Sequence, residues 1–520
     1  MRSSAVPAGP LLLRVRGRRS LASRAAALAA VVALVLAGCA GGGGSGTPAS
    51  SSSRFPNGLT ACVAGGQAAR CGRVWVPQDW AHPRGPRMPL KVLVLPAGAA
   101  HLAADPLFYL AGWDGQAVGY GNAVENGLGW ASQAFSGLRR TRDLVFVEQR
   151  GTPGSGFQAC PAPRPGSALS PAAVPAWVRR CLASARRDPR HDTTTAAARD
   201  LDQVRKALGY NKINLYGVSY GVTMGLAYLQ RYSAHVRTAV LDSGSLLNVR
   251  LLQQQLVHVP QAFGQWARLC AADHACAPAY HPAADMATVL AHLKAHPARV
   301  TLPASTFTTG GQQRVTITVS FFLQMLNDEY LSSSLTAVSL PADLRAMARG
   351  QWQQVIDRRG YTTAILPAAG PISLQGITIE CSDSWAAVDP AKVRQQTGSP
   401  FGPIFTVANA EARQALCTSW PHDPGVSATV HTSVPVVFLN GIADPTDPPA
   451  NVVAATRTMP HALLVSVPGA AHWVLNWTLN PGCLLAATTE FIQSGKPASP
   501  APWAACTRTL AHQPLPFSAP

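Results

Sequence analysis

The sequence predicts an α/β fold with a mostly parallel central sheet and a largely helical cap insertion. Short apolar runs recur along the chain and helical patterns lie between them, an alternation that is typical of parallel sheets. Most of the runs are continuous, as expected for strands that helices cover on both faces. The alternation stops at about residue 247 and resumes at Val434, so we expect the segment between them to be inserted over the carboxyl end of the sheet.

The first residues have the pattern of an export signal. An apolar run at 25–38 follows an arginine-rich start and ends in LAGC at Cys39; it is too short for a confident membrane span. We expect residues 1–38 to be a lipoprotein signal peptide and Cys39 to carry the lipid that anchors the protein to the outer face of the bacterial membrane. Residues 39–53 are then a Gly/Ser-rich tether. An ordinary cleaved signal and a secreted form remain the alternative, and Arg18-Arg19 also allows twin-arginine export.

The composition indicates a folded chain. Of 520 residues, 47% are hydrophobic and 13% charged, which excludes wholesale disorder. The net charge is +18, but six arginines and no acidic residue precede Cys39, which leaves +12 for the rest. The remaining arginines form no basic stripe interleaved with aromatic residues, so we expect no nucleic-acid partner.

Seven apolar runs are predicted strands: residues 90–95, 107–110, 144–147, 213–216, 238–241, 434–439 and 463–467. The clearest helix spans 195–208, with threonines before it as caps and Gly209 after it as a stop. A β-like patch at 314–319 lies inside the insertion. We therefore expect four segments after the tether: the first part of the α/β domain (54–246), the cap insertion (247–430), the second part of the α/β domain (431–510) and a tail (511–520).

Besides Cys39 the chain has ten cysteines, an even number that fits an oxidising compartment. They form five couples close in sequence, and we expect disulfides, although spacing leaves their connectivity open: Cys62 and Cys71, Cys160 and Cys181, Cys270 and Cys276, Cys381 and Cys417, Cys483 and Cys506. No C-x-x-C pair or Cys/His cluster with ligand spacing occurs in the sequence, so we predict no metal site.

The strand at 213–216 leads into Gly217-Val218-Ser219-Tyr220-Gly221 and then into an apolar helical stretch. A G-x-S-x-G between a strand and a helix predicts a nucleophile elbow, in which a tight turn lifts the serine hydroxyl above the sheet. The glycines leave room in the turn, and the helix directs its positive end at the site. Ser219 is therefore the predicted nucleophile.

A serine hydroxyl needs a base and an orienting carboxylate, which in this fold class follow on later strand ends in the order Asp, His. Asp444 comes just after the strand at 434–439, with Asp447 as a competitor three residues further on. His472 follows the strand at 463–467, whereas His461 precedes it and is excluded. We predict a triad of Ser219, Asp444 and His472, which needs no metal or organic cofactor.

At these residues the chain resembles the tripeptidyl-aminopeptidase-like branch of the proline-iminopeptidase group of α/β-hydrolases. The resemblance runs from about Phe55 to Ser494 and rests on DLVFVEQRGTPGSG (143–156), RDLD (199–202), GVSYG, GIADPTDPP and PGAAH. It implies the α/β-hydrolase fold and the same triad. Members of this group are mostly secreted or envelope-attached serine exopeptidases, and some also act on esters.

One loop departs from the pattern of the group. Its oxyanion loop reads roughly H-G-G-P-G-G, whereas this chain has Leu-Ala-Gly-Trp-Asp-Gly-Gln at 110–116. Aligned on the group, the oxyanion donors are the backbone N–H groups of Trp113 and Tyr220. A backbone donor survives a side-chain change. Asp114 can place a carboxylate near the oxyanion or point away to solvent, and we favour the second arrangement, so the size of the activity and the substrate stay open.

The predicted function is hydrolysis of peptides from their N-terminus, by a chain that we expect to be monomeric. An exopeptidase must recognise a free amine, and the candidate carboxylates are Glu380, Asp328 and Glu329. One alternative is a carboxylesterase or lipase with the same triad. The other is a weakly active lipoprotein that binds peptides.

Overall fold

The computed structural model describes residues 58–98, 102–112, 128–160, 170–304, 311–362, 372–426 and 429–517. All of them belong to the unit formed by residues 55–520. The predicted signal peptide, Cys39, the tether and Trp113 with Asp114 lie outside the described residues.

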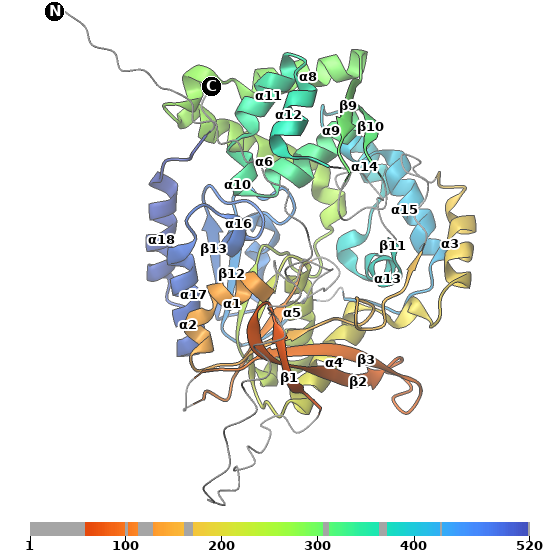
Figure 1. Cartoon of the computed structure of the whole chain (residues 1–520), viewed down its shortest axis with the longest axis vertical. Helices are drawn as coiled ribbons and strands as arrows, with labels where there is room; N and C mark the ends of the chain where they lie inside the picture. Colours follow the sequence, from red (N-terminus) through yellow and green to blue (C-terminus); the bar gives the residue numbers. More distant parts are fainter. Residues whose placement is uncertain are drawn as a thin grey trace, which may run out of the picture. The chain divides into compact units, whose positions relative to one another are not determined.

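Nine strands form one sheet (Figure 1). Their spatial order is β1 (Thr60–Ala64), β2 (Gln67–Pro77), β3 (Arg87–Leu95), β5 (Leu144–Val147), β4 (Leu107–Leu110), β7 (Ile213–Val218), β8 (Val236–Asp242), β12 (Val436–Gly441) and β13 (Ala462–Val467). The pairs from β5 to β13 are parallel, and those among β1, β2, β3 and β5 are antiparallel. The predicted α/β-hydrolase fold with a mostly parallel sheet is therefore confirmed.

All seven predicted strands are present, with ends shifted by up to a few residues. The strands β1 and β2, which form the antiparallel edge, were not predicted. Their residues are exposed or half-buried over most of their length, so they lack the continuous apolar run that marks a strand covered on both faces.

Helices cover both faces of the sheet. They are α1 (Trp130–Ala134), α2 (Ser136–Arg139), α3 (Val174–Ala183), η4 (Pro189–His191), α4 (Thr194–Ala207), α5 (Tyr220–Tyr232), η5 (Ser233–His235), η10 (Pro449–Asn451), η11 (Val453–Arg457), α16 (Val474–Trp477), α17 (Gly482–Ser494) and α18 (Pro500–His512). Neighbouring strand residues point to opposite faces: Phe108 and Leu215 pack in a core with α4 and α5, whereas Tyr109 and Tyr216 pack in another with α17 and α18. The predicted helix at 195–208 is α4, whose first turn is capped by the Thr193 hydroxyl.

A mainly helical segment separates β8 from β12. It contains α6 (Leu251–Ala272), α7 (Cys276–Ala279), α8 (Pro282–Ala295), β9 (Ala298–Leu302), β10 (Gln313–Ile317), α9 (Val319–Met325), the π-helix η6 (Leu326–Leu331), α10 (Ser334–Ala337), α11 (Leu340–Ala348), α12 (Trp352–Arg359), β11 (Ile372–Ser373), α13 (Leu374–Ser382), η8 (Ser384–Ala386), α14 (Pro390–Gln396), η9 (Gly402–Ile404) and α15 (Val407–Ser419). The β-like patch is β10, paired with β9 in a small antiparallel sheet, and β11 pairs with β6 (Ala159–Cys160).

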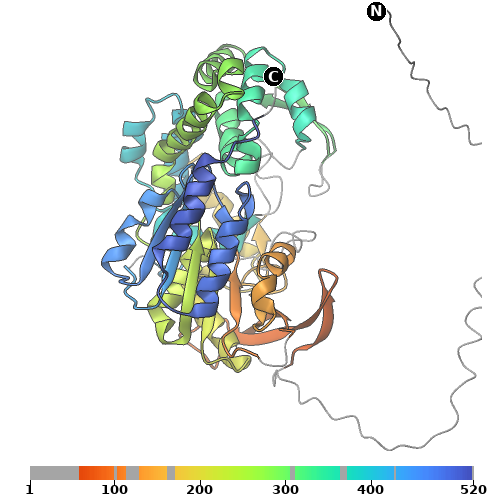
Figure 2. The ribbon, with the colours of Figure 1, turned by 90° about the vertical axis from the view of Figure 1, so that its left-hand side faces the viewer.

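The helices α6, α8, α11 and α12 gather beyond one end of the sheet in two perpendicular views (Figures 1 and 2). They share a hydrophobic core of their own, and this core also includes Ala443 and Ala471 from the loops after β12 and β13. The inserted segment therefore packs directly on the two loops that carry the predicted acid and base.

Five disulfide bonds join the same cysteine couples that the spacing in the sequence suggested. Among the helices of the described ranges, none is both long enough and apolar enough to cross a membrane.

Candidate active site

Ser219 occupies a strained turn between β7 and α5. Its backbone has φ 54° and ψ −122°, a conformation that non-glycine residues rarely adopt and that clusters at functional sites. The two flanking glycines make the turn possible: a Cβ on Gly217 would lie 2.4 Å from the Gly221 carbonyl oxygen, and one on Gly221 would lie 2.1 Å from the Leu110 carbonyl oxygen. The local structure is thus that of the predicted nucleophile elbow.

The candidate oxyanion loop approaches Ser219 where the described residues end. A Cβ on Gly112 would lie 3.1 Å from the Ser219 Cβ, so the chain passes beside the nucleophile directly before Trp113. The other predicted donor, the N–H of Tyr220, opens α5. The Tyr220 hydroxyl accepts a hydrogen bond from Gln149 Nε2 at 2.9 Å and lies 2.7 Å from Thr194 Oγ1.

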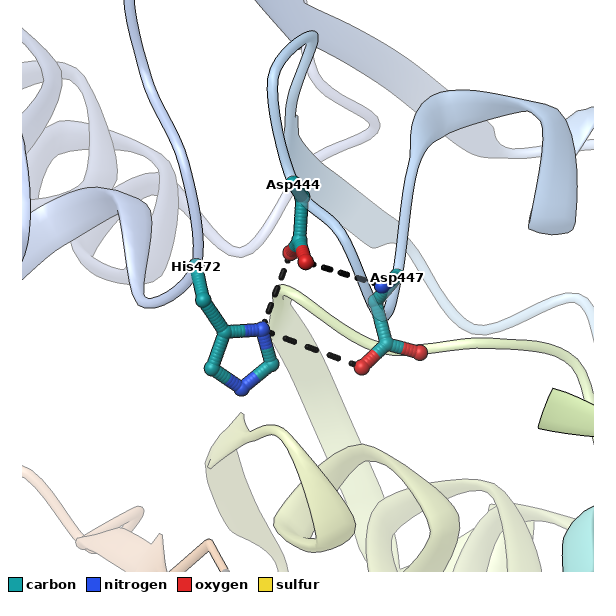
Figure 3. Close-up of side chains that lie close together, drawn as sticks. All are labelled: Asp444, Asp447 and His472. Atoms are coloured by element: carbon teal, nitrogen blue, oxygen red, sulfur yellow. Dashed lines mark hydrogen bonds and ion pairs between the residues drawn. The ribbon is translucent and has the colours of Figure 1, made fainter. Parts of the chain in front are cut away.

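Asp444 and His472, the predicted acid and base, are joined by a hydrogen bond. His472 Nδ1 lies 2.9 Å from Asp444 Oδ2, as Figure 3 shows. The other oxygen of Asp444 accepts hydrogen bonds from the N–H groups of Thr446 and Asp447, at 2.8 and 2.9 Å. These bonds orient the carboxylate, and its hydrogen bond orients the ring of His472 through Nδ1.

Asp447, the competitor in the sequence, lies close to the same nitrogen. Its Oδ2 is 3.8 Å from His472 Nδ1, beyond hydrogen-bond distance. Burial raises the pKa of Asp447 to about 7, the nearby Asp444 adds to the rise, and His472 opposes it. Asp444 is therefore the hydrogen-bonded partner of His472, and Asp447 is a second buried carboxylate beside it.

The imidazole of His472 binds its proton strongly. Burial lowers its pKa, but the carboxylates of Asp444, Asp447 and Asp242 outweigh burial and raise the pKa to about 9. The side chain is 15% exposed, so solvent reaches part of the ring.

Asp242, which was not predicted as a site residue, binds the backbone of the loop that follows β13 and carries His472 (the histidine loop). This fully buried carboxylate ends β8 and accepts hydrogen bonds from the N–H groups of Val474 and Leu475, at 2.8 and 3.0 Å. It also accepts one from the Tyr216 hydroxyl, at 2.7 Å, and that hydroxyl accepts one from Trp473 Nε1. A carboxylate at the end of a predicted strand was the signal that could have found it.

The three predicted triad residues follow β7, β12 and β13, and β8 links β7 to β12 in the parallel part of the sheet. The carboxyl ends of parallel strands meet at one edge, so Ser219, Asp444 and His472 lie along the same edge. The pair of acid and base there can accept a proton from a hydroxyl, and the turn presents a serine hydroxyl.

The three candidate amine-binding carboxylates differ in their surroundings. Glu380 is engaged in an ion pair with Arg413, at 2.6 Å. Asp328 is exposed and accepts hydrogen bonds from Gln324 and Asn327. Glu329 is half-buried on the π-helix η6, and burial followed by the charge of Asp328 raises its pKa.

A cavity of about 340 Å³ opens between α6 and the loop that follows β12 and carries Asp444 (the acid loop). Ile442, Asp444 and Pro448 line it from the loop, and Pro260 and Arg268 are among the residues that line it from the helix. Its size is within the range of small-ligand pockets.

Within the described ranges, the side chains of Asp444, Asp447 and His472 form the one group with the spacing of metal ligands. Both oxygens of Asp444 and the Nδ1 of His472 already take part in hydrogen bonds to one another or to the backbone. Their geometry is that of an acid–base pair, and we assign no metal to it.

The chain is similar in sequence and in fold to several known proteins. A family profile of the α/β-hydrolase fold matches residues 118–477. The chain is 31% identical over 190 residues to a tripeptidyl aminopeptidase of Streptomyces coelicolor, a match that covers 34% of this chain and spans only 35% of that relative. It is 24% identical over 423 residues to the serine protease Hip1 of Mycobacterium tuberculosis, a match that covers 73% of this chain and 77% of the relative. Among solved structures, an esterase from Thermogutta terrifontis aligns with 82% of this chain and 99% of its own, at 15% identity and a TM-score of 0.34.

Proposed function

We propose that this chain, which belongs to the α/β-hydrolase fold family, is an exported serine exopeptidase that releases short peptides from the N-terminus of its substrates. The observation that carries the proposal is the strained Ser219 turn at the same sheet edge as the hydrogen-bonded Asp444–His472 pair. The names of the relatives, tripeptidyl aminopeptidase and serine protease, favour a peptide over other acyl substrates.

In the proposed mechanism the Ser219 oxygen attacks the scissile carbonyl carbon and its proton passes to Nε2 of His472. Asp444 holds the other nitrogen and stabilises the imidazolium. The carbonyl electrons move to the oxygen, which accepts hydrogen bonds from the N–H groups of Tyr220 and Trp113. The imidazolium then protonates the leaving amine, and water releases the acyl group from Ser219 by the same steps in reverse order.

An exopeptidase also needs a group that recognises the free α-amine, and Glu329 is the best placed of the three candidates. It is half-buried without an ion-pair partner among the described residues, whereas Glu380 already pairs with Arg413. The same stretch of chain contacts the loop that carries His472: the hydroxyl of Ser334, five residues after Glu329, accepts a hydrogen bond from the N–H of Ala471.

The test uses the exported protein with its disulfides intact, beside a Ser219→Ala variant. Both are assayed on chromogenic amides of free-amine di- and tripeptides, on N-blocked versions of the same peptides, and on short acyl esters. Hydrolysis of the free-amine peptides alone, absent in the variant, supports the proposal. Turnover of esters without peptides would replace it by a carboxylesterase, and a folded protein inert on every substrate would contradict both.

We also propose that the protein is held at the membrane by lipid on Cys39. Five disulfides are typical of an exported protein, and the LAGC sequence matches a lipidation site. Cells grown with a labelled fatty acid should yield labelled protein in the membrane fraction. The Cys39→Ala variant should carry no label, and a labelled variant would contradict the assignment.

A further inference from the structure

We propose that Asp447 is a second positioning carboxylate for His472, which together with Asp444 holds the imidazole proton and so sets the pH above which Ser219 is activated. The inference rests on the proposed serine-hydrolase function and extends it to the regulation of the same site.

Two carboxylates converge on one ring nitrogen. Asp444 Oδ2 lies 2.9 Å and Asp447 Oδ2 3.8 Å from Nδ1 of His472. Figure 3 shows an oxygen of each carboxylate directed at that nitrogen. An imidazolium has one N–H to give on that side, so Asp444 takes the hydrogen bond and Asp447 contributes its charge.

The surrounding structure holds Asp447 in this position. The Ser245 hydroxyl donates a hydrogen bond of 2.6 Å to its Oδ1, which leaves Oδ2 directed at the ring. The backbone is held as well: the N–H of Asp447 donates to Asp444 Oδ1, and its carbonyl oxygen accepts from Asn440 Nδ2, at 2.9 and 2.8 Å. The side chain is 3% exposed, so solvent screens its charge only weakly.

The other titratable groups of the described residues around His472 either add negative charge or are disfavoured by burial from carrying a positive charge of their own. Asp242 faces it from the end of β8 and adds negative charge. His258 faces the acid loop from α6, and burial lowers its pKa although Asp444 opposes the shift; Arg268 on the same helix is exposed to solvent. Among the residues that the structure describes, the imidazolium of His472 is therefore the cation that balances these buried carboxylates.

The consequence for catalysis has a definite sign. Only neutral imidazole accepts the Ser219 proton, so the rate of serine attack rises with pH through the pKa of His472, which is about 9. Removing the charge of Asp447 removes one of the groups that raise this pKa. A neutral side chain at 447 is therefore expected to make the serine reactive at lower pH.

The experiment measures the rate at which a fluorophosphonate modifies Ser219 between pH 5 and 10, because this reaction needs no knowledge of the natural substrate. The full chain is compared with Asp447→Asn, which keeps the size of the side chain and an acceptor for Ser245. Asp79→Asn is the matched control, since Asp79 also bonds a histidine, His82 at 2.6 Å, on the loop after β2. We expect the rise in rate to move down by up to about one pH unit in Asp447→Asn. The difference should be largest near pH 8, where the wild-type Asp447 is ionised and His472 is still mostly protonated, and the profile should not move in Asp79→Asn.

An unmoved pH profile in Asp447→Asn would overturn the inference. If this variant instead reacts slowly at every pH, titration of the His472 ring by nitrogen NMR decides: a lowered pKa supports the inference, and an unchanged one contradicts it. Failure of the wild-type protein to react with the reagent would contradict the proposed function itself, and the NMR titration would still test the role of Asp447.

Discussion

The hydroxyl oxygen of Ser334 accepts a hydrogen bond of 3.0 Å from the backbone N–H of Ala471, the residue directly before His472. Ser334 is fully buried and opens α10 in the inserted segment. The same segment encloses the side chains of Ala443 and Ala471 in its core. The cap is thus joined to both loops of the acid–base pair by packing and by a specific polar bond.

Replacing Ser334 by alanine should loosen the histidine loop. The buried N–H of Ala471 would lose its partner, which costs about 1–3 kcal/mol in free energy of unfolding. We expect a lower melting temperature together with slower fluorophosphonate labelling. Ser333→Ala is the control, because Ser333 caps α10 at Leu335 and not the histidine loop; equal labelling of the two variants would disprove the link.

Replacing Asp242 by asparagine should displace the backbone that directly follows His472. An amide nitrogen cannot accept hydrogen bonds, so at least one of the donors from Tyr216, Val474 and Leu475 loses its acceptor. We expect labelling of Ser219 to slow by at least about tenfold, because small displacements of reacting groups are costly. Asp143→Asn is the matched control, because Asp143 also binds a tyrosine hydroxyl and a backbone N–H, those of Tyr210 and Ala97. Asp143 directly precedes β5, however, whereas Asp242 is the last residue of β8. Asp143→Asn should lower stability and leave labelling unchanged.

The contribution of Asp447 to the free energy of unfolding should depend on pH. Its pKa rises from the usual 3.8 to about 7 on folding, so the folded state binds the proton more tightly than the unfolded state. The stability associated with this group is present below about pH 4 and is lost as the pH rises to 7. Asp447→Asn should therefore gain melting temperature relative to wild type between pH 4 and 8. A difference that does not change with pH would contradict this shift.

Substitutions of Glu329 and Glu380 should show which of the two carboxylates recognises the substrate amine. If Glu329 binds the substrate amine, Glu329→Gln should lower kcat/KM on free-amine peptides by about 10- to 100-fold, the value of a hydrogen bond to a charged group. Ester substrates, which have no amine, provide the reference rate. Glu380→Gln breaks only the ion pair with Arg413, and we expect its kcat/KM to stay near wild type. The reverse result would exchange the two assignments.

Two disulfides of the inserted segment should differ in their contribution to stability. Cys381 and Cys417 are 36 residues apart, and Cys270 and Cys276 are 6 apart. A longer loop loses more entropy when it is closed in the unfolded chain, so removing these bonds should cost about 4 and about 2 kcal/mol respectively. Urea denaturation of the two double-alanine variants measures both. An equal or reversed cost would show that native-state strain or residual structure dominates.

Much of the site follows from local sequence. The strands around Phe108 and Phe438 are continuous apolar runs because both faces of the sheet are buried. The spacing of Gly217 and Gly221 around Ser219 predicts the turn, because a side chain at either glycine would collide with backbone. The edge strands β1 and β2 were missed, since residues exposed to solvent are not constrained to be apolar.

The sequence by itself determined the fold class, the nucleophile turn and the strand ends from which an acid and a base project. Only the tertiary structure decided that Asp444 bonds His472 while Asp447 stands 3.8 Å from it. It also decided that Asp242 and Ser334 hold the histidine loop, and that Glu380 is already paired. The physical reason is the range of the interactions. Strand and turn patterns reflect contacts between near neighbours in the sequence, whereas these pairs join residues 25 to 232 positions apart.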